Sequence, residues 1–182
     1  MPDLSPGVQA AWQSAAAEAV GLRHELLEPL HLFIGICSIE NLLSAEAQEK
    51  LPMAPRAAAA LWLEWNALSP LFAKIGSSPA TLGRDARSAL GRGNYAGDDA
   101  RQVSRSEASR TAFWRAAQLA EKSGASTTNL AHLFAALLDD VWGAVPTFLV
   151  LRGVDVSALA AAARALAFPG PAAITPPDVP SR

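Results

Sequence analysis

The chain of 182 residues contains little cysteine and lysine, and it has no long hydrophobic run. Its single cysteine, Cys37, cannot form a disulfide within the chain, so the sequence does not require an oxidising compartment. The first seven residues lack the basic start and the apolar core of a signal peptide. Apolar runs end at Glu64 and Arg152, well short of the roughly 18 residues that a membrane-spanning helix needs. We therefore expect a cytoplasmic protein without membrane insertion.

The chain also lacks a large excess of charge of either sign, because it has 15 basic and 17 acidic residues and a formal net charge of −2. The basic side chains form no stripe that could follow a row of phosphates. The phosphate-binding pattern G-x-x-x-x-G-K-[ST] and the serine-nucleophile pattern G-x-S-x-G are missing. The sequence thus predicts neither nucleic-acid binding nor ATP hydrolysis. We identify no catalytic constellation, no cofactor site and no metal site.

Alanine is abundant, whereas β-branched residues are few and show no sustained alternation with polar residues. This composition predicts an all-α fold. Helix starts are marked by Ser5-Pro6, Ser69-Pro70 and Ser78-Pro79, by Ser106 and by Asn129. Gly76 is predicted to end a helix in the left-handed conformation. We expect helices over residues 6–21, 29–43 and 56–68, two more that start at 70 and 79, further helices over 107–124 and 130–138, and two last ones separated by Gly153 and Asp155.

The sequence repeats itself at an offset of 101 residues. Ser5 corresponds to Ser106, and the triplet that begins at His31 corresponds to the triplet at His132. The positions between and after them match in the same order: Ala11 with Ala112, Trp12 with Phe113, Ala15 with Ala116, Ala16 with Ala117, Ala19 with Ala120, Leu32 with Leu133 and Phe33 with Phe134.

The repeat divides the chain into two helical units. About 24 extra residues near 38–62 must be set aside before Gly76 and Leu82 match Gly153 and Leu159, so the first unit carries an inserted helix. We predict a first repeat over 4–90, a glycine-rich linker over 91–104, a second repeat over 105–168 and a proline-rich tail over 169–182. Each repeat is then a four-helix unit, and two units stacked about a pseudo-twofold axis bury the apolar stripe that neither covers alone.

This double pattern resembles the Clp N-terminal domain, the tandem four-helix repeat at the front of the Clp-type AAA+ unfoldases ClpA, ClpB and ClpC. The resemblance covers residues 4–166 and rests on the two His-Leu-Phe triplets, on Gly124, and on His24 and Pro29. It implies a non-catalytic module that binds a substrate protein, an adaptor of the ClpS kind or another subunit, and that delivers substrates to a AAA+ chaperone or Clp protease. Without a phosphate-binding loop, we expect a stand-alone domain or the front part of a longer protein.

Two departures from this family concern partner choice. Leu30 and Ala131 stand where the family has a glutamate before each histidine. In the ClpC branch these glutamates belong to pockets for phosphorylated arginine, so that specificity is not implied here. The tripeptide Arg92-Gly93-Asn94 resembles the ClpV unfoldase of type VI secretion, which binds a helix of the sheath. A ClpV-like domain is therefore the alternative partner-binding module.

The inserted helix supplies most of the candidate protein-binding residues. Leu61, Trp65 and Leu68 share one helical face, and Trp62 lies beside them. Two interpretations stand: the helix covers the core of the first repeat, where each tryptophan contributes about 2–3 kcal/mol by burial, or it presents an aromatic ridge to a partner. Together with the departures at Leu30 and Ala131, these residues form the predicted binding set.

Other residues with chemical potential receive structural interpretations. His31 and His132 lie in the first turns of matching helices, where a neutral ring packs and hydrogen-bonds the neighbouring loop. A small helical metal-dependent enzyme that uses both histidines and Cys37 is the alternative, and it requires the three side chains to converge. The remaining predictions are solvated surface for the pairs Asp98-Asp99 and Asp139-Asp140, and core for Trp12 and Phe113.

Overall fold

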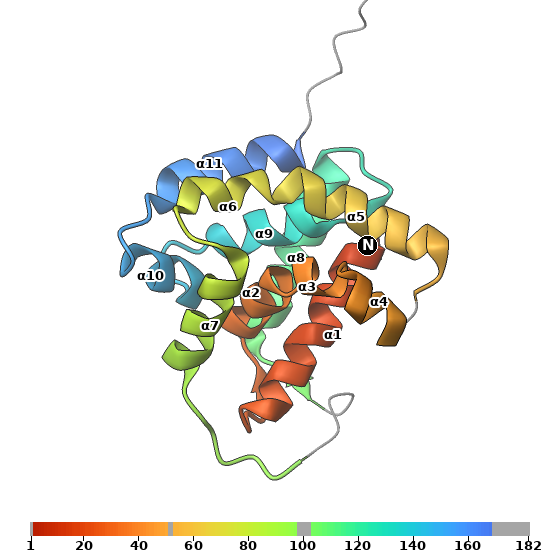
Figure 1. Cartoon of the computed structure of the whole chain (residues 1–182). Helices are drawn as coiled ribbons and strands as arrows, with labels where there is room; N and C mark the ends of the chain where they lie inside the picture. Colours follow the sequence, from red (N-terminus) through yellow and green to blue (C-terminus); the bar gives the residue numbers. More distant parts are fainter. Residues whose placement is uncertain (1, 51–52, 98–102, 169–182) are drawn as a thin grey trace, which may run out of the picture.

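A computed structural model of the chain describes residues 2–50, 53–97 and 103–168 (Figure 1). Its first half contains β1 (Asp3–Leu4), α1 (Pro6–Gly21), β2 (Leu26–Leu27), α2 (Pro29–Cys37), α3 (Ile39–Leu42), α4 (Ala45–Lys50), α5 (Pro55–Leu68), α6 (Pro70–Ile75) and α7 (Pro79–Leu90). Its second half contains β3 (Ser104–Arg105), α8 (Glu107–Lys122), β4 (Thr127–Thr128), α9 (Leu130–Leu138), α10 (Ala144–Val150) and α11 (Val156–Ala167). Helices dominate, which confirms the all-α prediction. Within these ranges, no helix combines the length and the apolarity needed to cross a bilayer.

Polar caps set where several helices begin. The side chains of Ser5, Ser78, Ser106 and Asn129 each accept a hydrogen bond from the backbone N–H three residues further along, as predicted. The prediction that Ser69 caps a helix is wrong. Its backbone is itself helical (φ −53°, ψ −33°) and its side chain makes no capping hydrogen bond, because α5 passes almost directly into α6 (Figure 1).

The inserted region divides into more helices than the sequence predicts. The helix expected over 29–43 ends at Cys37, where Ser38 Oγ donates to the carbonyl of Ile34 at 2.9 Å. The chain then turns into α3, which places Ile39 in the core. The short helix α4 was not predicted from the sequence. The predicted terminator Gly76 does adopt the left-handed conformation, with φ of 71°.

Short strands, which the sequence analysis does not predict, connect the two halves of the chain. β1 pairs in parallel with β4, and β2 pairs in parallel with β3. An offset of 101 residues takes β1 onto β3 and β2 onto β4, so each half contributes one strand to each pairing. A strand of two residues is too short to show alternation, and its pairing partner lies about a hundred residues away.

Helices α2 and α9 form the centre of the core. All residues of 30–37 and of 130–138 are buried. Phe33 and Phe134 stack across the centre with ring centroids 6.4 Å apart. Helix α1 presses closely on α2, because a Cβ atom at Gly35 would lie only 2.1 Å from the carbonyl oxygen of Ala11. The predicted alanine stripe is buried at this contact.

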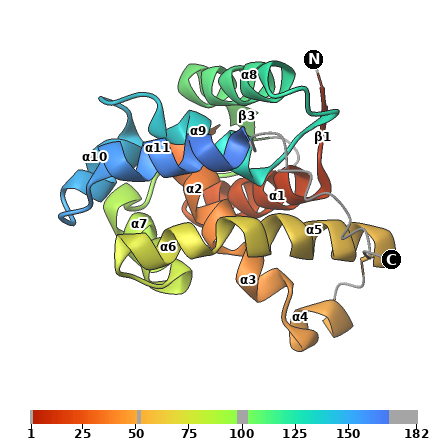
Figure 2. The same ribbon diagram turned by 90° about the horizontal axis from the view of Figure 1, so that it is seen from above.

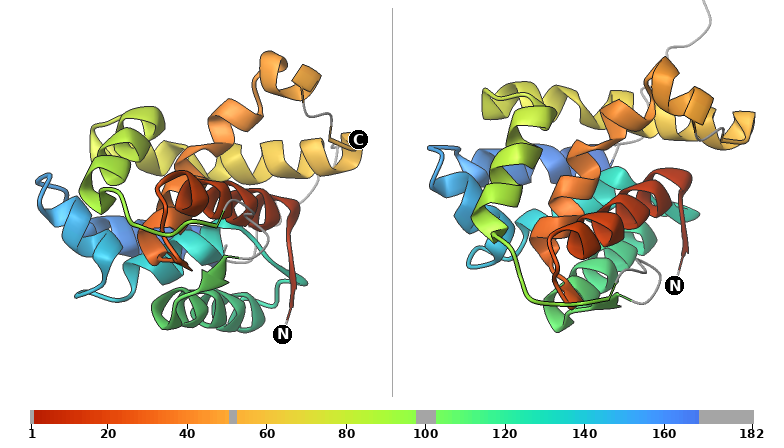
Figure 3. Two further views of the ribbon diagram at one scale, coloured as in Figure 1. Left: turned by 90° about the horizontal axis from the view of Figure 1, so that it is seen from below. Right: turned by 60° about the horizontal axis from the view of Figure 1, so that its bottom comes forward.

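Helix α5 lies along α1 and also packs against α9 and α11 (Figure 2). Residues 91–97 of the predicted linker form neither helix nor strand and run past the end of α1 (Figure 3). There the N–H of Gly93 donates to Leu22 O at 2.8 Å and the N–H of Tyr95 donates to Arg23 O at 2.9 Å. The end of the predicted linker forms β3. The predicted tail over 169–182 and the pair Asp98-Asp99 lie outside the described residues.

Candidate protein-binding surfaces

The inserted helix α5 is mainly part of the core. Leu61 and Leu68 are fully buried, and Trp65 is buried against Phe72 with ring centroids 5.5 Å apart. Trp62 points the other way and is 54% exposed, next to the exposed Leu63. The structure therefore follows the core-covering interpretation for three of the four predicted residues. The aromatic ridge is reduced to Trp62, with Leu63 as a neighbour that the sequence analysis did not single out.

Leu30 and Ala131, the other two predicted binding residues, are also buried. Each is the second residue of its helix, and both belong to the hydrophobic core. A partner cannot reach these side chains in this conformation. An apolar residue at each position suits this burial, because a charged glutamate there would lose its hydration.

Glu64, on the same helix, connects the N-termini of two helices from different halves. Its Oε2 atom accepts hydrogen bonds from Ser5 Oγ at 2.8 Å and from the N–H of Leu130 at 2.9 Å. Its Oε1 atom accepts one from the N–H of Gly7 at 3.2 Å. Helix N-termini present unpaired N–H groups and a partial positive charge, which a carboxylate satisfies. Glu64 therefore anchors α5 to the body of the protein, a role that the sequence analysis missed.

The two repeated histidines are buried and hydrogen-bonded, in agreement with the structural interpretation. His31 Nδ1 accepts from the N–H of Glu28 at 2.9 Å, and His132 Nδ1 accepts from the N–H of Asn129 at 3.2 Å. The far nitrogen of His31 lies 2.9 Å from His24 Nδ1. Burial, followed by the nearby His24, lowers the pKa of His31 to about 4, and burial also lowers the pKa of His132. Both rings are thus held neutral near pH 7.

The metal-dependent alternative finds no convergent ligand set in the part of the chain that the structure describes. No three His, Cys, Asp or Glu side chains there gather in a way that could hold a metal ion. Cys37 is buried, and burial raises the pKa of its thiol. This alternative requires the side chains of His31, His132 and Cys37 to converge, and that prediction is wrong.

The tripeptide Arg92-Gly93-Asn94 has an internal structural role. A Cβ atom at position 93 would lie 2.3 Å from the carbonyl oxygen of Arg23, so only glycine fits the contact with the turn after α1. Arg23 itself has a φ of 59°, which is uncommon for a residue other than glycine. Together with His24 and Tyr95, this turn lines an open pocket of about 670 Å³.

Two further predictions change in the structure. Asp139 is not simply solvated, because Arg164 Nε donates to its carboxylate at 2.8 Å, whereas Asp140 is exposed. Phe113 is core as predicted, but Trp12 is 36% exposed at the edge of α1. The guanidinium of Arg105 lies over both rings, 5.4 Å from the centre of Trp12 and 5.2 Å from that of Phe113.

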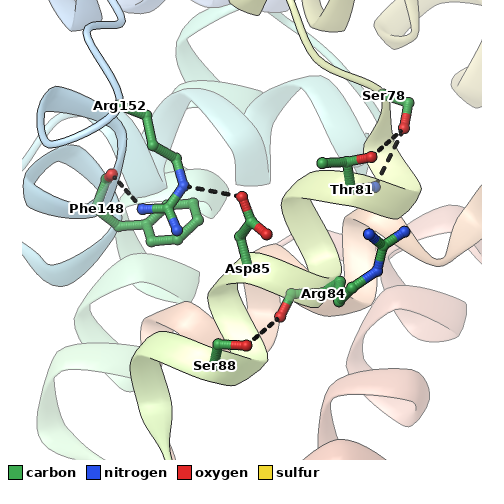
Figure 4. Close-up of polar contacts among 7 residues, drawn as sticks. All are labelled: Ser78, Thr81, Arg84, Asp85, Ser88, Phe148 and Arg152. Atoms are coloured by element: carbon green, nitrogen blue, oxygen red, sulfur yellow. Dashed lines mark hydrogen bonds and ion pairs between the residues drawn. The ribbon is translucent and has the colours of Figure 1, made fainter.

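Exposed apolar side chains also gather around α10. Trp142 is 91% exposed, and three exposed neighbours accompany it: Val141, Val150 and Leu151. The turn after α10 is held by Arg152, whose guanidinium covers the ring of Phe148 at 3.7 Å and whose Nε donates to Asp85 on α7 at 3.3 Å (Figure 4). Val150 and Leu151 thus lie beside a turn that is fixed to the first half of the chain, whereas Val141 and Trp142 lie in the turn before α10; Val141 and Val150 line a common hollow. We call residues 141, 142, 150 and 151 the α10 patch.

No protein-family model fits the sequence, and no curated protein is significantly similar to it. The most informative features are therefore this chain's own exposed tryptophans. Four of its five tryptophans are exposed, at positions 12, 62, 114 and 142, and only Trp65 is buried. A residue of this size is usually buried, and exposed tryptophans are frequent where proteins bind one another.

Proposed function

We propose that the chain is a non-catalytic protein-binding module built from two copies of one helical unit. It binds substrate proteins or adaptors for a Clp-type AAA+ unfoldase or Clp protease. The protein-binding part rests on one observation, the α10 patch with its almost fully exposed Trp142. Exposed apolar side chains that lie close together mark interaction sites, and Val141 and Val150 of this patch line one hollow.

The arrangement as two copies is supported by the order and length of the elements. An offset of 101 residues takes β1, α1, β2 and α2 onto β3, α8, β4 and α9, with the same bounds to the residue. An offset of 77 residues takes α7 onto α11 in the same way. The difference of 24 residues falls in the region of α3, α4 and α5, which corresponds to the inserted segment.

Aromatic contacts give independent support for a pseudo-twofold axis. Residues near such an axis should touch their own counterparts, and Trp12 meets Phe113 at 6.1 Å while Phe33 meets Phe134 at 6.4 Å. Contacts away from the axis should occur twice. Phe33 meets Phe148 of α10 at 5.7 Å, and Phe134 meets Phe72 of α6 at 5.7 Å.

The connection to Clp-type unfoldases is inferred from this arrangement together with the repeated His-Leu-Phe triplets. In both halves the histidine completes the first turn of a central helix by accepting from the N–H three residues before it. A ClpV-like domain is the alternative within the same architecture. The identity of the bound protein separates the two, because the first expects an adaptor or client and the second expects a helix of a contractile sheath.

A site-specific cross-linking experiment tests the proposal. A photoreactive phenylalanine analogue replaces Trp142, and the purified chain is irradiated in lysate of the organism that encodes it. We expect mass spectrometry to identify a AAA+ unfoldase, its adaptor or its clients at this position. The control carries the same analogue at Ala73, which is exposed on α6 and is not part of the α10 patch. Equal products at both positions, or products that include no member of an unfoldase system, would refute the proposed function.

A further inference from the structure

A groove of about 520 Å³ lies between α8 and the start of α2. Its walls include Pro29, Ala108, Thr111, Ala112 and Val145, which are small or apolar. Side chains of the α9 C-terminus and the turn before α10 close its other side. The groove is separated from α5, since α1 lies between α8 and α5 in Figure 2.

The matching surface of the other half already holds a helix. Helix α5 is fastened there by three donors to Glu64, which come from Ser5, Gly7 and Leu130. An offset of 101 residues relates these three positions to Ser106, Ala108 and Pro29. All three of the related residues line the open groove. The groove is therefore the counterpart of a surface that receives a helix within this same chain.

The bound helix shows what shape the surface accepts. Helix α5 inserts Leu61, Trp65 and Leu68 from one face, and Glu64 lies between them at the helix N-termini. An occupant of the open groove should therefore be an amphipathic helix with apolar residues at positions i, i+4 and i+7. Its residue at i+3 should meet the start of α8 and of α2.

The open groove differs from the filled one in its donors and in the charged side chains that line it. Pro29 replaces Leu130 and has no N–H to give to a carboxylate. Three acidic side chains, Glu28, Glu107 and Asp140, line the groove against one basic residue, Arg115. Across the described residues, none of these three carboxylates has an ion-pair partner. A glutamate at i+3 would thus lose one donor and meet like charge, whereas a lysine or arginine would be paired.

We propose that this groove docks a basic amphipathic helix presented by a partner protein. The inference rests on the two-copy arrangement of the proposed function and adds the chemistry of the partner. A second copy of this chain is a poor occupant, because its own α5 carries Glu64 and is already anchored. The groove and the α10 patch share the turn that contains Asp140 and Gly143, so one partner can contact both.

Peptides with the sequence of α5, residues 55–68, provide the probe. One carries Glu64→Lys and one keeps Glu64, and both are held helical by a hydrocarbon staple between positions 59 and 63, which are exposed on α5. Binding to the full chain is measured by fluorescence anisotropy, and the contacted amides are identified by NMR. We expect the lysine peptide to bind about fivefold to tenfold more tightly and to shift the amides of Ala108, Thr111 and Ala144.

Two chain variants make the result decisive. Glu107→Lys with Asp140→Lys reverses the charge at two exposed positions, and we expect it to reverse the preference between the peptides. Thr111→Arg fills the groove and should abolish binding of both. Equal affinities, no binding at millimolar peptide, or a footprint elsewhere on the chain would overturn the proposal. These failures would leave the cross-linking result at Trp142 unaffected, so the two proposals are tested separately.

Discussion

Replacement of Glu64 by glutamine tests how the inserted helix is held. The carboxylate accepts three hydrogen bonds, from Ser5 Oγ, Gly7 N and Leu130 N. In Glu64→Gln one of the two oxygens becomes an NH2 group, which faces at least one of these donors and loses that bond. A hydrogen bond to a charged group contributes about 1.5–3 kcal/mol, and each helix N-terminus loses a further ~0.3–1 kcal/mol of charge–dipole attraction. Because the site is only partly buried, we expect the free energy of unfolding to fall by about 2–3 kcal/mol.

Urea denaturation followed by circular dichroism measures this change. The matched control is Glu121→Gln, an exposed position on α8, which should change stability by less than about 0.5 kcal/mol. Hydrogen exchange adds a local readout, because the amide of Leu130 donates directly to Glu64 and should exchange faster in the variant. If Glu64→Gln behaves like Glu121→Gln in both measurements, the anchoring role derived from these distances is incorrect.

Three further perturbations address the core. Folding lowers the pKa of His31 to about 4, so between roughly pH 6.5 and pH 4 the unfolded chain binds a proton that the native chain does not bind. The free energy of unfolding should therefore decrease by up to ~3 kcal/mol as the pH is lowered through this interval. In a pH series of urea midpoints, His31→Gln should flatten this decrease. Gly35→Ala places a Cβ 2.1 Å from a carbonyl oxygen of α1 and should lower the free energy of unfolding by about 3 kcal/mol, measured by thermal or urea denaturation. Gly21→Ala is the control, because position 21 has open space around it and the change should be neutral or stabilising. Equal effects of the two variants would argue against the close contact between α1 and α2. Thr128 Oγ1 is buried without a hydrogen-bond partner among the described residues, so Thr128→Val should raise stability by about 1 kcal/mol, and a loss would reveal a partner for this hydroxyl.

Helix starts could be predicted from the sequence because they depend on local chemistry. Ser5 and Ser106 each need only the N–H three residues further on, and the prolines that follow Ser5 and Ser78 suit the first turn. Ser69 has the same local signal but fails as a cap, since the packing of α5 and α6 keeps its backbone helical. Helix ends were less predictable. The break after Cys37 depends on where Ile39 finds a place in the core, which the periodicity of the segment does not encode.

The candidate surfaces were predicted only in part, for a similar reason. The pattern of apolar residues on α5 identified a face, and the structure shows that Leu61, Trp65 and Leu68 turn it inward. Which face is inward depends on α1 and α9, far away in the sequence. The anchoring by Glu64 has no sequence signature, because its donors lie 57 to 66 residues away. The exposure of Trp142 likewise follows from the position of its turn outside the core.

The exchange of strands between the halves affects how the protein folds as it is made. Residues 3 and 4 find their pairing partners at 127 and 128, so β1 is synthesised more than a hundred residues before the strand that completes it. A nascent or truncated chain that stops before residue 127 keeps an open strand edge and lacks the Leu130 donor for Glu64. Such a fragment has the features that chaperones and proteases recognise. The first half is therefore synthesised well before the residues that complete its structure. The yield of folded protein in cells should depend on how well the first half is protected from aggregation and proteolysis until the second half has emerged.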